Sequence, residues 1–296
     1  MSLKLNERYP GRFNNPSAAY PQGSFKNRTS PTAKDGSYLE KDWANDKEGF
    51  FQSLLSEAGI TPNGVVDSVG SSQFYSAAKQ LFNPGRLIGV KVIQTSGTYT
   101  PTTGTKFVLA RLIGGGAAGS GAAATNASQI SVGGGGASGS DLYVLITNPV
   151  AMAAVIGAGG LGVLGGTGGA GGSTTLGSLA TAPGGLSGGS VAVSSTSTFN
   201  GGQPGAAGAL PTTTATLITA AKGQPGTLGI VMNGFVFSGN GGSGPFGGGG
   251  VGNFNGIGGA GAGPGSGGAG SASPVSSAAT AGGKGSDGCI EMWEYS

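Results

Sequence analysis

The chain has 296 residues, of which 66 are glycine, and a net charge of +3 at neutral pH. Glycine lies far above its usual share of about 7%, but collagen's strict third-residue spacing is absent, and an apolar content of 37% with so little charge argues against disorder. The chain has no histidine and one cysteine, which excludes a Ser-His-Asp triad, a His-ligated metal site and an internal disulfide.

The first 37 residues are predicted to form an extended arm. Four prolines stand among Asn, Ser and Gly, which favours turns over a helix, and the apolar run of a secretory signal is missing. Solvated disorder of the arm is the alternative, but its spaced aromatic side chains favour contact with a partner's surface. These side chains are Tyr9, Phe13, Tyr20 and Phe25.

Two short helices are predicted after the arm. In the first, Trp43, Phe50 and Leu54 share one face with Phe51 beside it, and Gly59 is placed to end the helix. The second should run from about Ser71 to Phe82, between a serine cap and an Asn-Pro-Gly turn. Helices this short cannot bury so many aromatic rings alone, so we expect them to pack against other chains.

Charge and glycine content divide the chain into two parts. Residues 1–90 carry ten of the fifteen basic and eight of the twelve acidic side chains, whereas residues 112–281 carry only Asp141 and Lys222. Glycine has the opposite distribution: fifty-five of the 66 glycines lie after residue 113. Because the net charge is small and the basic residues of the first part are interspersed with acidic ones, no nucleic-acid partner is expected. The shift in composition predicts two domains, residues 1–88 and residues 89–296.

Two strands are predicted to enclose the glycine-rich block, near residues 105–113 and 287–295. The first is a β-branched and aromatic run, and the second alternates in "CIEMWEYS", where Cys289 is expected to be a small buried residue. We expect the two strands to pair and close one domain. The most apolar uncharged run, residues 142–164, contains Asn148, Pro149 and several glycines, so no membrane helix is expected.

The stretch "GAGGLGVLGGTGGAGG", residues 157–172, matches the dinucleotide fingerprint formally. No helix pattern follows it, and no acidic residue stands about twenty positions on, so no cofactor is expected. A flexible linker would lack the regularly placed Leu161, Val163 and Leu164. Glycines recur here every third residue, which is the period of the polyproline II helix. Such segments have no internal hydrogen bonds, so their amides must bond to neighbouring segments.

Glycine costs about 0.5–1 kcal/mol relative to alanine in regular structure, so this many glycines need compensation. Burial between chains is the natural source, which predicts an oligomer, with three-fold symmetry the first expectation. The spacing breaks between Ser187 and Thr216, and an all-β trimer with glycine-rich loops is the alternative. The expected fold class is therefore mixed, mainly β and irregular. It comprises an arm with two short helices, then strands bracketing polyproline-II-like glycine helices in an intertwined trimer.

The N-terminal sequence "LNERYPGRFNNPSAAYPQGSFKNRTSPTAKDGSYLEKDW" resembles that of tail fibre proteins of tailed bacteriophages, and so does the frame "GTYTP…FVLARLIGGG" with the closing "GGKGSDGCIEMWEYS". The glycine-rich block is similar to the receptor-recognition adhesins of T-even-like phages. The resemblance implies a structural virion protein, assembled in the host cytoplasm as a homotrimer. Its N-terminus would dock on another tail or baseplate protein, and its distal end would attach to a bacterial receptor, either a polysaccharide or an outer-membrane protein. Unlike long fibres, this chain has no extended shaft.

Two groups of residues are candidate contact sites under this hypothesis. Aromatic and amide side chains on loops suit receptor binding, although each Phe could instead fill the core and each Asn could serve a turn. A purely structural tail or baseplate component is the alternative function. An enzyme is not expected, because residues 112–281 hold a single carboxylate and glycoside hydrolysis uses two. The receptor candidates are Phe235, Phe237, Phe246, Asn253, Phe254 and Asn255, and the virion-docking candidates are Tyr9, Phe13, Tyr20, Phe25, Trp43, Phe50, Phe51 and Leu54.

Overall fold

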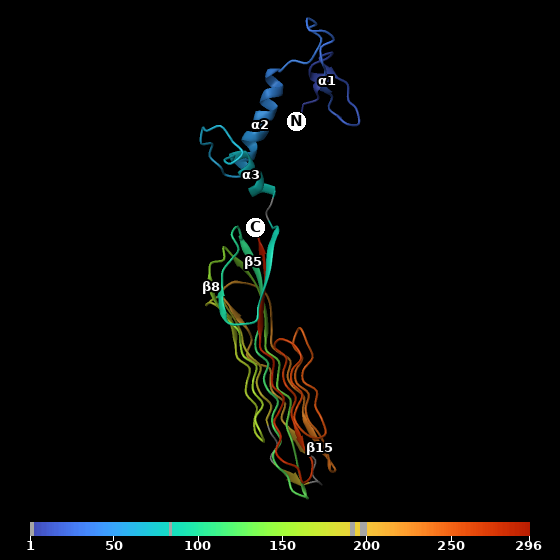
Figure 1. Cartoon of the computed structure of the whole chain (residues 1–296), viewed down its shortest axis with the longest axis vertical. Helices are drawn as coiled ribbons and strands as arrows, with labels where there is room; N and C mark the ends of the chain where they lie inside the picture. The colour runs from blue at the N-terminus through green and yellow to red at the C-terminus, as the bar shows by residue number, and fades with distance from the viewer. Residues whose placement is uncertain (1–2, 83–84, 190–192, 196–199) are drawn as a thin grey trace. The chain divides into compact units, whose positions relative to one another are not determined.

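The computed structural model describes residues 3–82, 85–189, 193–195 and 200–296. Within these residues the chain is mainly β-structure with three helices, and it divides into two compact units, residues 1–84 and 85–296 (Figure 1). The division falls before the predicted boundary at residue 88. The reason is that strand β3, Leu87–Ile93, which was not predicted, pairs with the C-terminal strand and therefore belongs to the second unit.

The N-terminal arm is folded on itself. It contains a one-turn helix, α1 (Leu5–Arg8), where the sequence predicted no helix, and a two-stranded pair, β1 (Phe13–Asn14) with β2 (Ser24–Phe25). Leu5 of this helix is buried. Four aromatic rings follow one another at centroid distances of 5.6, 5.1 and 5.2 Å, so the arm's aromatic side chains pack largely on each other. The series is Tyr9, Phe13, Phe25 and Trp43.

Both predicted helices are present. Helix α2 (Lys41–Glu57) ends as expected at Gly59, which has a φ of +66° and donates its amide to Ser56. Helix α3 (Gln73–Phe82) is capped by Ser72, one residue after the predicted cap, because the Ser72 hydroxyl accepts the Tyr75 amide at 3.0 Å.

The two helices pack against each other. Leu54 and Leu55 of α2 are buried with Ala77 of α3, and the Phe51 ring lies 4.8 Å from the Phe74 ring. Phe51 is half-buried by this contact and Phe50 is exposed, so the expected packing against other chains stays a prediction.

The second unit begins with a β-sandwich. One sheet has the order β14–β7–β5–β18–β3 and the other the order β13–β10–β9–β8–β4. Val108, Leu112, Ile290 and Met292 of the first sheet are buried against Leu176 and the other core residues of the second. The remaining bounds are β14 (Thr216–Ala221), β7 (Asp141–Thr147), β5 (Phe107–Ile113), β18 (Cys289–Tyr295), β13 (Thr212–Thr213), β10 (Ala180–Ala182), β9 (Thr174–Leu176), β8 (Met152–Val155) and β4 (Gly97–Tyr99).

The predicted pairing of the two bracketing strands is confirmed. Strands β5 and β18 pair antiparallel along their whole length, from Cys289 opposite Ile113 to Tyr295 opposite Phe107. The strands start two residues later than predicted, at residues 107 and 289. The glycine-rich block thus leaves the sandwich and returns to it in the same sheet.

Hydrogen bonds in the glycine-rich block repeat every three residues. Within residues 114–122, every third amide donates to the same neighbouring segment, at 2.7–3.1 Å, so that three consecutive residues bond to three different segments. Residues 133–140 follow the same rule with three neighbours of their own. Figure 1 shows these segments running side by side. In the first segment, the amides of Gly116, Gly119 and Ala122 donate to carbonyls of residues 280–286. Those of Gly115, Ala118 and Gly121 donate to residues 166–172, and those of Gly114, Ala117 and Ser120 donate to residues 134–140.

Glycine is required in this block by the close approach of neighbouring backbones. A Cβ added at Gly119 would lie 2.0 Å from the carbonyl oxygen of Ala269, and one at Gly282 would lie 2.0 Å from that of Gly119. These contacts are made within one chain. The argument that the glycines need burial between chains is therefore corrected, because the neighbours that compensate them belong to the same molecule.

Two small sheets close the end of the block that lies farther from the sandwich. Their inward residues, among them Ile130, Val132, Val231 and Val236, form a second core. One sheet has the order β11 (Ser194–Ser195), β6 (Gln129–Val132) and β17 (Ala272–Ser273), and the other β12 (Asn200–Gly202), β15 (Gly229–Met232) and β16 (Phe235–Phe237).

Candidate functional site

The hairpin β15–β16 carries an exposed apolar face at the end of the glycine-rich block. Asn233 and Gly234 connect its strands with φ values of 45° and 85°, as a tight two-residue hairpin turn requires. Along both strands buried and exposed residues alternate, so Val231 and Val236 point to the second core and their neighbours point outward. The outward residues are Ile230, Met232, Phe235 and Phe237, all apolar and all exposed.

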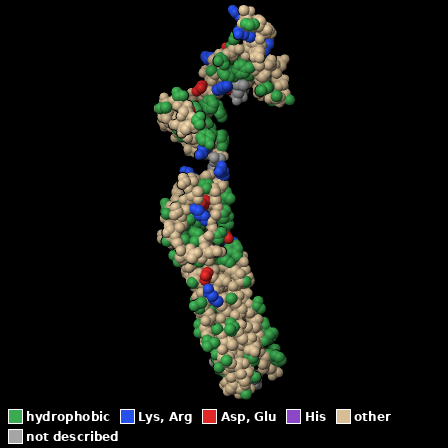
Figure 2. Space-filling view, viewed as in Figure 1, with side chains coloured by type: hydrophobic (Ala, Val, Ile, Leu, Met, Phe, Trp, Pro, Cys, Tyr) green, Lys and Arg blue, Asp and Glu red, His purple; other side chains and the backbone are tan. Residues whose placement is uncertain are grey.

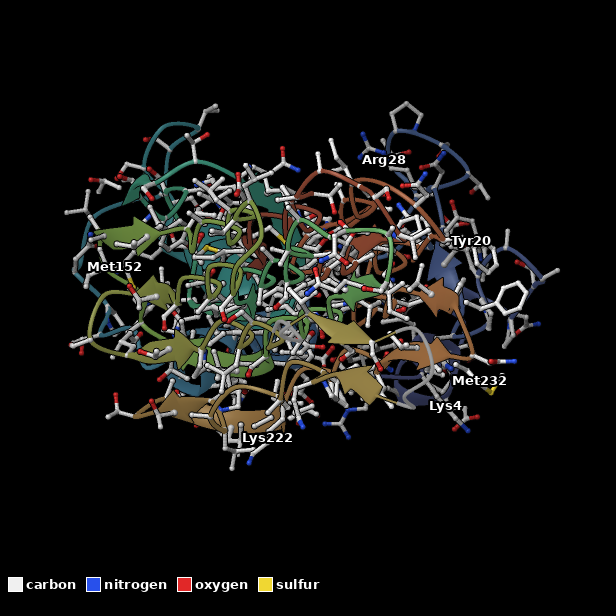
Figure 3. The ribbon with its side chains drawn as sticks, turned by 90° about the horizontal axis from the view of Figure 1, so that it is seen from below. Lys4, Tyr20, Arg28, Met152, Lys222 and Met232 are labelled. Atoms are coloured by element: carbon white, nitrogen blue, oxygen red, sulfur yellow. The ribbon has the colours of Figure 1, made fainter. Side chains whose placement is uncertain are left out.

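A neighbouring loop extends this face. The Phe254 ring lies 5.0 Å from the Phe237 ring, and it is 67% exposed. We call Ile230, Met232, Phe235, Phe237 and Phe254 the tip face. In Figure 3, which views the second unit from this end, the labelled Met232 lies at the outer margin of that unit. The tip face is hydrophobic and uncharged, and it can bury apolar surface against a partner or stack on flat groups.

The predicted receptor residues divide between three places. Phe235, Phe237 and Phe254 belong to the tip face. Asn255 is exposed beside them, whereas Asn253 holds the loop: its amide donates to the Ser238 hydroxyl at 2.8 Å, and its side chain donates to the carbonyl of Ile257. The Asn253 side chain is therefore engaged within its own loop.

The segment that follows β16 begins at the tip face, and Phe246 lies at its opposite end, near the sandwich. Its ring is 4.9 Å from the guanidinium of Arg111, a residue of the sandwich. Phe246 therefore does not join the other candidates, contrary to the sequence-based grouping. Sequence reasoning also missed Ile230 and Met232, although the alternation in "GIVMNGFVF" around an Asn-Gly turn is the signal that would have found them.

The predicted virion-docking residues differ in exposure. Phe13 and Leu54 are buried, which removes them from any docking surface, and Tyr9, Trp43 and Phe51 are half-buried in the contacts described above. Tyr20, Phe25 and Phe50 are exposed, and Figure 3 labels Tyr20. Exposure therefore leaves these three as the docking candidates.

Among the described residues of the sandwich, Glu294 has the one fully buried carboxylate, and all of its contacts are with neighbouring side chains and backbone of the same sandwich. Glu294 accepts hydrogen bonds from the Tyr99 hydroxyl at 2.8 Å and from Thr102, and it pairs with the Lys91 ammonium at 3.0 Å. Burial tends to raise the pKa of Glu294, but the bonds from Thr102, Tyr99 and Lys91 lower it below its usual value. The Glu294 carboxylate therefore connects the loop that contains Thr102 to strand β18.

The described residues contain no group of three or more His, Cys, Asp or Glu side chains placed to hold a metal ion. Nor does any helix in the described parts of the chain have the length and hydropathy needed to span a membrane. Comparison with models of protein families and with curated proteins gave no match for this chain.

Proposed function

We propose that this chain is a tail fibre protein of a tailed bacteriophage. Its N-terminal unit would dock on a tail or baseplate protein, and its tip face would bind a receptor on the bacterial surface. The proposal starts from the resemblance described above, and the observation that carries it is the exposed tip face. A contiguous exposed apolar face is uncommon on a protein surface unless it serves an interaction.

The glycine-rich segments would act as a stiff spacer that presents the tip face. We assign them to helices of the polyglycine II type, and the three-residue repeat of their hydrogen bonds supports this assignment. At a rise of about 3.1 Å per residue, residues 114–125 would span roughly 35 Å. Figure 2 shows few charged side chains on the visible surface of this block.

The homotrimer is retained in the proposal through the resemblance alone. The glycine argument for it no longer applies, because the glycine contacts lie within one chain. Self-association or docking would then involve the exposed aromatic residues of the N-terminal unit, Tyr20, Phe25 and Phe50.

Competition with phage adsorption tests the function. The full chain is added to a panel of bacterial strains, and both binding to cells and protection from infection are measured. The test variant combines Phe235→Ser with Phe254→Ser, and the control is Leu161→Ser, because Leu161 is equally exposed but lies outside the tip face. We expect the double variant to bind at least about tenfold more weakly, as for the loss of aromatic anchors, and the control to bind normally.

Two outcomes would contradict the proposal. Normal binding by the double variant would show that the tip face does not contact the host. A folded full chain that binds no strain of the panel would favour the alternative, a tail or baseplate component that contacts other virion proteins alone.

A further inference from the structure

The outer face of the sheet β14–β7–β5–β18–β3 holds a pocket that is separate from the tip face. Arg111, Asp141, Tyr143, Thr219 and Trp293 line a hollow of about 370 Å³. This volume lies within the range of about 300–1,000 Å³ that is usual for small-molecule sites. The opposite face of the same sheet is buried in the sandwich core.

The sheet register brings these side chains together from four strands, β14, β7, β5 and β18. Arg111 of β5 stands opposite Tyr143 of β7 on one side and opposite Glu291 of β18 on the other. Trp293 follows Glu291 by two residues, so it shares the same face of the sheet. Residues from distant parts of the chain thereby line one pocket.

A charge-neutral pair offers both donors and acceptors to a ligand. Arg111 donates through Nε to Oδ1 of Asp141 at 3.0 Å and through Nη2 to Oδ2 at 2.6 Å. A guanidinium has more N–H groups than these two bonds use, and a carboxylate has further lone pairs. The Phe246 ring against the guanidinium also holds it in place. Adjacent donors and acceptors of this kind match neighbouring hydroxyl groups, each of which can donate and accept.

Two aromatic rings supply the apolar part of the pocket. Trp293 and Tyr143 are half-buried, with ring centroids 6.1 Å apart and planes at 84°. Flat ring surfaces suit the C–H face of a sugar ring, because that face is apolar while the ring edge carries hydroxyls. Hydroxyl-rich ligands with one apolar face are therefore favoured over ligands that are wholly apolar.

The charges around the pocket balance. Glu291 lies beside Arg111 on the sheet, and Lys222 lines an adjoining hollow of about 290 Å³ that shares Arg111 and Asp141. Figure 3 shows Lys222 at the outer margin of the molecule. Two positive and two negative side chains give no net charge, which favours a neutral ligand over an ionic one. The adjoining hollow, which also includes Gln224, gives room for a second unit of a chain.

We propose that this pocket binds a neutral pyranose unit of an oligosaccharide or polysaccharide. The sugar would pack on Trp293 and Tyr143, and two neighbouring hydroxyls would bond to Arg111 and Asp141. The proposal does not rest on the function assigned to the tip face, and each can fail without the other.

Binding is tested with the full chain carrying Trp43→Phe. The sequence has two tryptophans, so Trp293 then becomes the sole tryptophan and its fluorescence reports on the pocket. An array of neutral and anionic bacterial oligosaccharides identifies ligands, which are then titrated against the fluorescence of Trp293. Thr219→Tyr fills the pocket from strand β14, and Thr216→Tyr is the matched control, because Thr216 is on the same strand but does not line the hollow. Both positions are exposed, and Tyr is well accepted in strands.

We expect at least one neutral oligosaccharide to change Trp293 fluorescence saturably. Thr219→Tyr should weaken that binding at least about tenfold, equal to about 1.4 kcal/mol, and Thr216→Tyr should change it less than about twofold. The proposal is overturned if no neutral sugar binds, if anionic sugars bind better, or if Thr219→Tyr leaves binding unchanged. Self-association of the chain that Thr219→Tyr abolishes would also overturn it, by making this face an interface between copies.

Discussion

Replacing one central glycine by alanine tests whether close backbone packing holds the glycine-rich block together. Gly119 is the best position, because an added Cβ would lie 2.0 Å from the oxygen and 2.1 Å from the carbon of the Ala269 carbonyl. Both atoms belong to a backbone, which cannot rotate away as a side chain would. Gly248 is the matched control, because a Cβ there meets nothing within 4 Å and its φ lies outside the left-handed region.

The expected cost can be estimated from two contributions. Overpacking in a tight core costs about 1–3 kcal/mol. Displacing the neighbouring segment also weakens backbone hydrogen bonds such as that from the Gly283 amide to the Ala269 carbonyl, and a buried group that loses its partner costs about 1–3 kcal/mol. Gly119→Ala should therefore lower the free energy of unfolding by about 2–6 kcal/mol. Gly248→Ala should be neutral, or stabilising by about 0.4–1 kcal/mol, because alanine restricts the unfolded chain.

Denaturation followed by Trp293 fluorescence in the Trp43→Phe background measures these changes in the second unit alone. For a unit of this size, each kcal/mol corresponds to about 2–4 °C in the midpoint of thermal unfolding. A Gly119→Ala variant that unfolds within about 0.5 kcal/mol of the Gly248→Ala variant would refute the reasoning, because surface changes alone have effects of that size.

Two further predictions concern titratable groups. The pKa of Glu294 is lowered in the folded state, so its contribution to stability is present above its unfolded pKa and is lost as pH falls through the lower folded value. Glu294→Gln should therefore destabilise the sandwich at pH 7 and make its stability depend less on pH in the acid range. An unchanged acid curve, measured by fluorescence between pH 7 and pH 2, would contradict this. Burial raises the pKa of the Cys289 thiol to about 11, so iodoacetamide at pH 8 should modify it only after unfolding. Rapid alkylation of the native protein, detected by mass spectrometry, would show that the thiol is accessible.

The candidate site was predictable in part. The aromatic residues Phe235, Phe237 and Phe254 could be selected because exposed rings on loops suit recognition, and they do lie together. Phe246 could not be separated from them by sequence, because its position depends on where the chain reverses inside the glycine-rich block. The pocket around Arg111 was not predicted either. Its residues come from strands whose register places Arg111 beside Asp141 and Trp293, and that register is not visible in the local sequence.

The sequence by itself determined the local features of this protein. The positions of helices α2 and α3, the Gly59 terminus, the paired strands β5 and β18, and the three-residue glycine period all follow from residue types and spacing. Only the tertiary structure decided which segments are neighbours. A three-residue repeat directs successive amides to three sides of the segment, but it does not determine whether their hydrogen-bond partners lie in the same chain or in another. Chain reversal within one molecule brings those partners together and so accounts for glycines that the sequence alone had assigned to an oligomer.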